Sequence, residues 1–276
     1  MAEREEYEVF AVKYAHNATR MASQNLIFND LHDSPMPLDY FVWVVRNAKR
    51  TFVVDTGFGP RESAERGTPL IRSPAEGLKL LGIDAAEVED VIITHLHYDH
   101  AGGQEHFPKA TFHLQDGEMS YATGRCMCFE AIRRPFDVEH VTDMVRKVYG
   151  GRVAFHDGDA ELAPGLSIHK IGGHSAGLMC VRVWTRRGWV VLASDCAHFY
   201  RNISERNPFI ICFNLGEMMN GFNKLEMLAD SGDHIVPGHD PLVMQYYPAP
   251  SPEMEGAVVR LDVAPFIHRL LDNLQR

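Results

Sequence analysis

The chain of 276 residues lacks long hydrophobic runs and regularly spaced cysteines. No window approaches the ~18 uninterrupted apolar residues of a membrane-spanning helix. The opening letters MAEREEYEVF carry charge where a secretory signal has an apolar run. The five cysteines are an odd number at irregular spacing, which argues against a disulfide framework and indicates a reducing compartment. We therefore expect a cytoplasmic protein with no membrane partner.

A surplus of positive charge is also absent. The formal net charge is −10, and because phosphate binding requires a basic surface, we expect no nucleic-acid partner. Long low-complexity tracts are missing as well. With 45% hydrophobic residues the chain is able to bury a substantial core, and we expect residues 1–276 to form one domain.

What the sequence does contain is an alternation of short apolar runs and helical patterns, typical of a layered α/β protein. The runs are rich in Val, Ile and aromatic residues, which favour strands. Strands are predicted within residues 7–15, 40–57, 91–96, 110–115, 166–172, 179–195 and 233–239. Apolar residues at helical spacing predict helices within residues 73–82, 137–150, 216–232 and 264–276.

Two stretches of the chain resemble each other. Residues 41–57 and 180–195 each read as a strand, a basic turn and a second strand, and they end near Asp55 and at Asp195. Two stacked sheets with helices outside would place both strand ends along one edge, where loops converge on a site. Chance recurrence of a hairpin is the alternative interpretation.

The stretch VIITHLHYDHAGG, residues 91–103, concentrates metal-binding side chains. His95 and His97 are two residues apart, so in extended geometry they point to the same side. Asp99 and His100 follow, and the small residues after them leave room for close approach. Imidazole and carboxylate groups suit zinc and similar divalent metals, and adjacent ligands of this kind are able to serve two ions.

Further ligands are expected at strand ends in the second half of the chain. His174 follows the predicted strand 166–172, Asp195 ends WVVLASD, and His239 ends DHIVPGH. Strand ends on one edge of a sheet meet in space even when they are far apart in sequence. Asp55 is expected to order the loops beneath the metals through hydrogen bonds rather than to bind a metal.

The motif HLHYDH resembles the HxHxDH signature of the metallo-β-lactamase superfamily, and the three later ligands follow in that family's order. The stretches GGHSAGLMCVRV, LASDCAHFY and IVPGHDP are most similar to the N-acyl-homoserine lactonase branch. The resemblance implies an αββα sandwich, an α/β fold of two mixed sheets flanked by helices. It also implies two divalent ions per chain, which we expect to be zinc. The implied ligands are His95, His97 and His174 for one ion, Asp99, His100 and His239 for the other, and Asp195 between them.

The same resemblance implies hydrolysis of a lactone by a hydroxide that the two ions share, with Asp99 taking up or relaying a proton. The true β-lactamases of the family carry cysteine at the position of Asp195, so this residue points away from antibiotic hydrolysis. The best-known lactonases carry a tyrosine three residues further on, where this chain has His198. His198, or Tyr200 two residues beyond, is expected to donate a hydrogen bond to the substrate oxygen.

Other functions remain open at this point. A hydrolase of another cyclic ester or amide, or a thioester hydrolase of the glyoxalase II kind, would use the same ligands; a metal-stabilised binding protein is disfavoured because both ligand sets are complete. The expected partner is a small lactone, and a homo-oligomer is compatible with the sequence. Side chains expected to line an apolar pocket are Met21, Phe28, Met119, Phe129, Phe199 and Phe209. Structural roles are expected for His106, His113, His140, His156, His169, His234 and His268.

Overall fold

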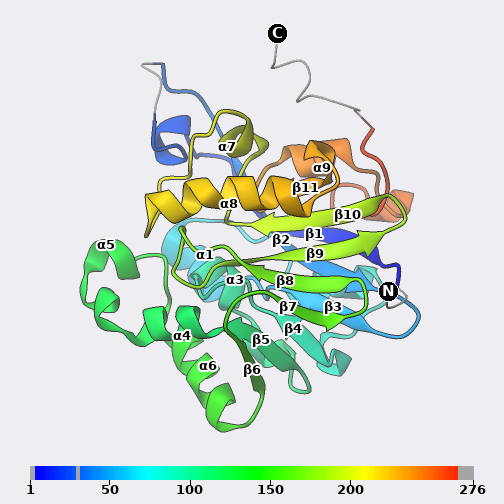
Figure 1. Cartoon of the computed structure of the whole chain (residues 1–276), viewed down its shortest axis with the longest axis horizontal. Helices are drawn as coiled ribbons and strands as arrows, with labels where there is room; N and C mark the ends of the chain where they lie inside the picture. Colours follow the sequence, from blue (N-terminus) through cyan, green and yellow to red (C-terminus); the bar gives the residue numbers. More distant parts are fainter. Residues whose placement is uncertain (1–3, 29–31, 267–276) are drawn as a thin grey trace.

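In the computed structural model, which describes residues 4–28 and 32–266, two β-sheets lie face to face and helices cover the outer side of each (Figure 1). Both sheets contain parallel and antiparallel neighbours. The predicted αββα sandwich of two mixed sheets is therefore confirmed. No helix within the described ranges is long and apolar enough to cross a membrane.

The larger sheet has seven strands in the order β12-β1-β2-β3-β4-β5-β6. Its first three pairings are antiparallel, and the pairings from β3 to β6 are parallel. The strands are β1 (Glu8–Asn17), β2 (Leu38–Arg46), β3 (Thr51–Val54), β4 (Asp90–Ile92), β5 (Thr111–Gln115), β6 (Val153–His156) and β12 (Val258–Arg260).

The smaller sheet has five strands in the order β11-β10-β9-β8-β7. Only the pairing of β10 with β11 is parallel. The strands are β7 (Ala160–Ala163), β8 (Leu166–Lys170), β9 (Met179–Thr185), β10 (Gly188–Ser194) and β11 (Ile235–Pro237). The two predicted hairpins are present as β2–β3 in the larger sheet and β9–β10 in the smaller one.

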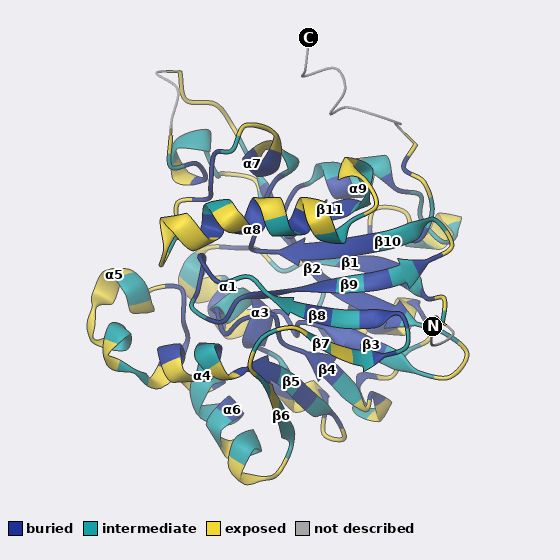
Figure 2. Cartoon of the chain, viewed as in Figure 1, coloured by how far each residue is buried: buried dark blue, intermediate teal, exposed yellow. Residues whose placement is uncertain are grey.

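The central strands are apolar on both faces because each sheet is covered on both sides (Figure 2). Successive residues of a strand point to opposite faces. In β1, Val9 and Ala11 therefore join the core between the sheets, while Phe10 and Val12 pack towards the helices. The alternation in VFAVKYA thus builds two cores from one strand.

Nine α-helices complete the described part of the chain. The predicted helices at 73–82, 137–150 and 216–232 are confirmed, and each is capped by a side chain at its start: Ser73, Asp137 and Asn214 accept a backbone N–H. The helices are α1 (Pro60–Arg66), α2 (Pro74–Leu80), α3 (Tyr98–Ala101), α4 (Asp116–Thr123), α5 (Glu130–Arg133), α6 (Val138–Tyr149), α7 (Tyr200–Ser204), α8 (Leu215–Leu228) and α9 (Leu242–Tyr246).

Some elements escape the sequence pattern. Helix α4 buries Glu118 beside Tyr121 and Ala122, so it shows no clean apolar stripe. Strands β6, β7 and β12 have three or four residues each, too few for a visible alternation. The helix predicted over 264–276 falls mainly outside the described residues.

Candidate metal centre

One end of the sandwich gathers the predicted ligands, because β4, β10 and β11 all end there and the β8–β9 loop passes over it. The segment between β4 and α3 contributes the HLHYDH motif. Gly102 closes this turn against the loop after β3: a Cβ at that position would lie 2.6 Å from the Gly57 carbonyl oxygen. The small residues after the motif are thus required for close packing, as expected.

The first group of ligand atoms comes from His95, His97, His174 and Asp195, which are all buried. The Nε2 atom of His174 lies 2.9 Å from Nδ1 of His97 and 3.1 Å from Oδ2 of Asp195. The Nε2 atom of His95 lies 3.6 Å from the same carboxylate oxygen. Three imidazoles and one carboxylate oxygen therefore face a common point.

The second group consists of Asp99, His100 and His239. The Nε2 atoms of His100 and His239 lie 3.2 and 3.1 Å from Oδ1 of Asp195. Asp195 thus presents Oδ2 to the first group and Oδ1 to the second. The arrangement brings all seven predicted metal ligands together, with one carboxylate between two sets of imidazoles.

Two buried ring nitrogens of the cluster have no hydrogen-bond partner within the described residues and are therefore suited to bind a cation. Nε2 of His95 and Nε2 of His100 are buried and lack a partner with hydrogen-bond geometry among the described residues. Burial lowers the pKa of His95 and His97 well below the usual value, which keeps both rings neutral and their lone pairs available. Neutral imidazole and carboxylate donors at this spacing suit zinc.

The outward nitrogens of the cluster histidines are anchored in the protein. Nδ1 of His174 lies 2.8 Å from the Ile211 carbonyl oxygen, and Nδ1 of His239 lies 2.9 Å from that of Asp39. A neutral ring bonded in this way donates through Nδ1–H and leaves Nε2 as an acceptor. The protein therefore selects the tautomer that a metal ligand needs.

Asp55 joins the two hairpin ends beneath the cluster. Its carboxylate accepts hydrogen bonds from the Thr94 amide (2.8 Å) and hydroxyl (2.9 Å), and it lies 2.7 Å from Nδ1 of His100. Ser194, at the end of the other hairpin, donates its hydroxyl to Thr94 Oγ1. Asp55 and Ser194 both adopt left-handed backbone geometry, with φ of 63° and 46°. Such strained positions persist where the surroundings determine them strongly.

Glu118 is a buried supporting residue that the sequence reading missed. Its carboxylate accepts hydrogen bonds from the Leu96 amide (2.9 Å), the Ser175 hydroxyl (2.7 Å) and the Gly177 amide (2.8 Å). It therefore ties the HLHYDH loop to the loop that carries His174. An isolated glutamate in the first turn of a helix resembles an ordinary solvated residue, so no sequence signal marks it.

His198 lies inside the cluster. Its ring stacks on Phe209 with centroids 3.5 Å apart, and its Nε2 lies 3.0 Å from Oδ2 of Asp195. Its Nδ1 is buried without a partner among the described residues. Burial lowers the pKa of His198 to about 3 against the opposing charge of Asp195. The neutral ring is thus positioned to donate a hydrogen bond to Asp195.

Tyr200, the other predicted substrate contact, is not brought to the cluster. Helix α7 begins at this residue and turns its side chain away from His198, towards the core between the sheets. The ring packs near Tyr246, and the hydroxyl bonds to Tyr247. Within the described residues Tyr200 thus contacts Tyr246 and Tyr247 rather than the proposed ligands, and its role in substrate binding stays a prediction.

The residues predicted to line an apolar pocket differ in how far they are buried. Phe199 and Phe209 are buried and Phe209 contacts His198, whereas Phe28 and Phe129 are more than 60% exposed and Met21 and Met119 are intermediate. Phe136, which was not predicted, packs edge-on against His97 at 4.7 Å.

The histidines for which structural roles were predicted lie apart from the seven proposed ligands where the structure describes them. His113 approaches Asp90 and stacks on His156, His140 approaches Glu62, and His169 approaches Asp159. His234 approaches the Arg187 carbonyl oxygen, and His106 is exposed beside Glu105. His268 lies outside the described residues.

Comparison with known proteins decides the family. The sequence profile described as the Metallo-beta-lactamase superfamily matches residues 36–247, well over half of the chain. The chain belongs to the metallo-beta-lactamase superfamily. The predicted similarity to its lactonase members is confirmed too, since the chain is 30% identical over 175 residues to N-acyl homoserine lactonase AttM of Azorhizobium caulinodans. That alignment covers 59% of this chain and 62% of the relative, which is less than two thirds of the relative's length.

Solved structures of other proteins share the fold. An N-acyl homoserine lactone hydrolase with the product N-hexanoyl-L-homoserine bound at its metal centre superposes with a TM-score of 0.69 at 19% identity, covering 88% of this chain and 96% of that one. AidC, described as a dizinc quorum-quenching lactonase, gives a TM-score of 0.65 at 17% identity, with coverage of 87% and 89%. At these identities the likeness establishes the fold alone.

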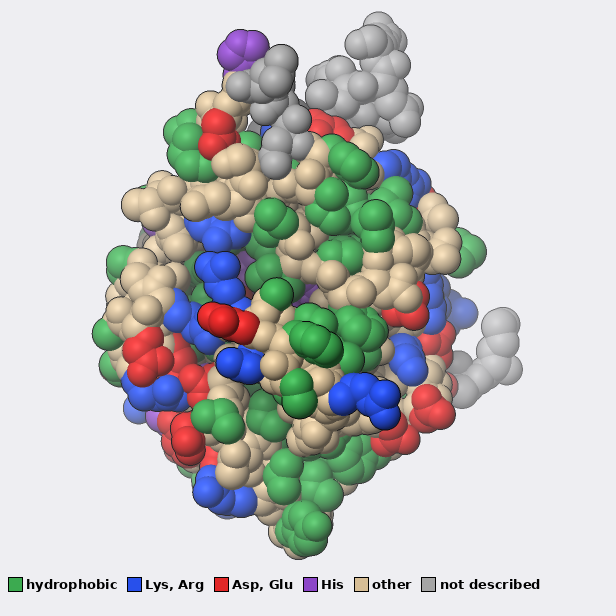
Figure 3. All heavy atoms as spheres, turned by 90° about the vertical axis from the view of Figure 1, so that its left-hand side faces the viewer, with side chains coloured by type: hydrophobic (Ala, Val, Ile, Leu, Met, Phe, Trp, Pro, Cys, Tyr) green, Lys and Arg blue, Asp and Glu red, His purple; other side chains and the backbone are tan. Residues whose placement is uncertain are grey.

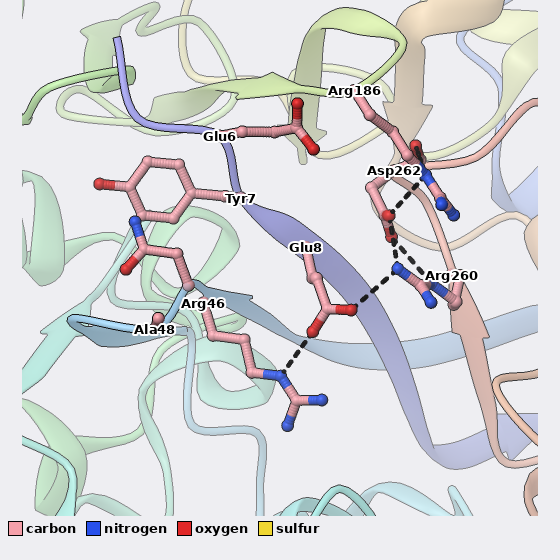
Figure 4. A pocket seen from close by; sticks show the side chains of 9 residues that line it. Glu6, Tyr7, Glu8, Arg46, Ala48, Arg186, Arg260 and Asp262 are labelled. Carbon is pink, nitrogen blue, oxygen red and sulfur yellow. Dashed lines mark hydrogen bonds and ion pairs between the residues drawn. The ribbon is translucent and has the colours of Figure 1, made fainter. Parts of the chain in front are cut away.

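A second hollow lies at the opposite end of the sandwich, where β1 begins and β2 ends (Figure 4). Its charged side chains pair with one another: Glu8 accepts hydrogen bonds from Arg46 (3.1 Å) and Arg260 (3.0 Å), and Asp262 accepts from Arg260 (2.7 Å). Because these groups already satisfy one another, the hollow offers no donor set for a metal.

Proposed function

We propose that this chain is a metal-dependent hydrolase that opens the ring of a lactone, with N-acyl-homoserine lactones as the first substrates to test. The observation that carries the proposal is the position of Asp195, whose two oxygens face two separate sets of buried histidines. Similarity to N-acyl homoserine lactonases supports the choice of substrate. A cytoplasmic enzyme acting on such signals would perform quorum quenching.

We assign two zinc ions to the cluster. His95, His97 and His174 would hold one, Asp99, His100 and His239 the other, and Asp195 both. When bound, such a pair of ions activates a water molecule and polarises the ester carbonyl.

The protein side chains contribute orientation and proton transfer. The Nε2 atom of His198 holds Asp195 in place. The ring of Phe209 stacks on the His198 ring and fixes its orientation. The side chain of Asp99 is 12% exposed, whereas the other six proposed ligands are 3% exposed or less. Asp99 is thus the proposed ligand most open to solvent, and we propose that it accepts a proton from the attacking water and passes this proton to the leaving alkoxide.

A substrate panel tests the proposal. Zinc-loaded protein is offered N-hexanoyl homoserine lactone, S-lactoylglutathione and benzylpenicillin, and hydrolysis is followed by proton release. We expect kcat/KM for the lactone to exceed that for the other two by about a hundredfold or more, a difference of ~3 kcal/mol in transition-state binding. Chelator-treated protein and the same protein after zinc is restored provide the matched control.

Each contrary result has a definite meaning. Faster turnover of the thioester than of the lactone would replace this proposal with a glyoxalase II-like activity. Two bound ions per chain with no hydrolysis of any compound would favour a binding protein.

A further inference from the structure

Basic side chains gather beside the metal centre although the chain as a whole carries a net charge of −10. Figure 3 shows histidine side chains deep in a hollow of the surface, with Lys and Arg side chains along one side and hydrophobic ones along the other. We use the name arginine rim for Arg20, Arg66 and Arg134, which come from three separate segments. None of the three forms an ion pair with a carboxylate within residues 4–28 and 32–266, where Arg46, Arg61 and Arg260 each do.

Arg20 connects this rim to the cluster. Its guanidinium carbon lies 5.7 Å from the centre of the Phe209 ring, and Phe209 stacks directly on His198. Its Nε and Nη2 atoms donate to Asn25 Oδ1 (2.9 Å) and the Gln24 carbonyl oxygen (2.7 Å). These bonds fix the direction of the guanidinium and leave its Nη1 donors free within the described residues.

Arg66 holds the other side of the rim in place. Its guanidinium lies 3.9 Å above the ring of Tyr98, the residue inside the HLHYDH motif. It also donates hydrogen bonds to the carbonyl oxygens of Arg134 (3.0 Å) and Phe136 (3.2 Å). Arg66 therefore fixes the backbone that carries Arg134, whose exposed side chain makes no hydrogen bond within the described residues.

The charges of the rim act on one another. Burial lowers the pKa of Arg20, and the nearby charge of Arg134 lowers it further, while Tyr40, Tyr98 and Asp99 oppose the shift. Holding like charges together costs electrostatic free energy, which an anion between them recovers. A guanidinium with free N–H groups matches a carboxylate in shape and charge.

We propose that the substrate of this site carries a carboxylate remote from its scissile ester, and that Arg20 and Arg134 bind this group at the mouth of the metal centre. The inference rests on the proposed lactone hydrolysis and narrows it to an anionic class of lactone. Arg66 acts as a positioning residue, because its donors are used by the backbone. The rim also attracts such a substrate from solution, an effect that salt weakens.

A matched pair of substrates tests the proposal. N-hexanoyl homoserine lactone and its adipoyl counterpart differ only in a terminal methyl or carboxylate group. We expect kcat/KM for the adipoyl lactone to be about tenfold higher, and the ratio to approach one in Arg20→Gln and Arg134→Gln. The ratio of the two kcat/KM values should also decrease when NaCl is raised from about 50 mM to about 500 mM. Arg146→Gln removes an exposed arginine bonded to Asp143 on α6 and should leave the ratio unchanged.

The ratio separates binding from folding, because a damaged fold would lower both rates together. Arg134→Gln is the safer variant, since the Arg134 side chain makes no hydrogen bond within the described residues. Equal rates for the two lactones, or a ratio that survives both substitutions, would overturn the proposal.

A binding measurement keeps the inference separate from the proposed activity. Calorimetry with the ring-opened adipoyl- and hexanoyl-homoserine products on zinc-loaded protein should show about tenfold tighter binding of the former, lost in Arg134→Gln. If no lactone is hydrolysed but this preference is present, the proposed function fails and the anion site stands. If lactones are hydrolysed without any preference in rate or binding, the anion site fails alone.

Discussion

Each end of the β-sandwich buries a carboxylate among basic side chains. At one end these side chains are arginines, and at the other they are histidines. At the end where β1 begins, Asp262 is 2% exposed and its Oδ2 lies 2.7 Å from Arg260 and 3.2 Å from Arg186. At the opposite end, Asp195 is also 2% exposed and is surrounded by histidines. Arginine is always charged, whereas histidine is readily neutral, so only the first carboxylate has permanent countercharges.

The two ends differ in whether the buried polar atoms around the carboxylate have partners, and an end with unpartnered atoms is able to bind a ligand. Buried polar groups are normally satisfied, and the network around Asp262 follows that rule. Around Asp195, the Nε2 atoms of His95 and His100 have no hydrogen-bond partner within the described residues. The other ring nitrogen of His100, Nδ1, contacts the carboxylate of Asp55. A buried carboxylate beside ring nitrogens that lack partners leaves room for cations, and this property distinguishes the candidate metal centre from the structural ion-pair network at the other end.

The largest effect is expected from removing the charge of Asp195. Asp195→Asn keeps the shape of the side chain but not the anionic bridge, so both ions should be bound less tightly. Since even outer partners of metal ligands are worth about 10- to 100-fold, we expect turnover to fall by more than about a hundredfold. Zinc content by elemental analysis, circular dichroism and lactone turnover should be measured on one preparation.

Asp262→Asn is the matched control, because it makes the same change to an equally buried carboxylate at the other end. It should lower the free energy of unfolding by about 1–3 kcal/mol while zinc content and turnover stay as in the wild type. Full zinc content and full turnover in Asp195→Asn would contradict the dinuclear interpretation.

A smaller effect is expected from Asp55→Asn. Asn tolerates the left-handed backbone at this position, so the loop should keep its shape. The amide no longer offers a carboxylate to Nδ1 of His100, which should weaken the second metal by about 10- to 100-fold. Competition with a zinc chelator measures this loss. Loss of both ions in equal proportion would show instead that Asp55 supports the whole cluster.

That the seven proposed ligands lie together was predictable from the sequence for a physical reason. His95, His97, Asp99 and His100 lie within one short segment, so the chain itself keeps them together. The distant ligands each follow an apolar strand, and strands of a sandwich end along shared edges. The two hairpins were predictable from the apolar runs on either side of each basic turn.

The supporting residues were not predictable because their roles arise only in three dimensions. Glu118 accepts N–H groups from two loops, at Leu96 and at Gly177, that are far apart in sequence. The packing of Tyr200 near Tyr246 likewise depends on two helices, α7 and α9, that are far apart in sequence. The arginine rim combines three segments, and each arginine alone resembles a solvated surface residue.

The smallest effect is expected at the far end of the sandwich, from Glu8→Gln. Glu8 is 42% exposed on its side chain and pairs with Arg46 and Arg260. Exposed ion pairs are screened by water and salt and contribute about 0–1 kcal/mol, so we expect the free energy of unfolding to fall by less than ~1 kcal/mol. Urea unfolding at low and high salt measures it, and the difference from wild type should shrink as salt rises. Zinc content should not change, since Glu8 lies at the end of β1 away from the cluster. A fall in zinc content, or a loss above ~2 kcal/mol, would show that the two ends are coupled rather than independent.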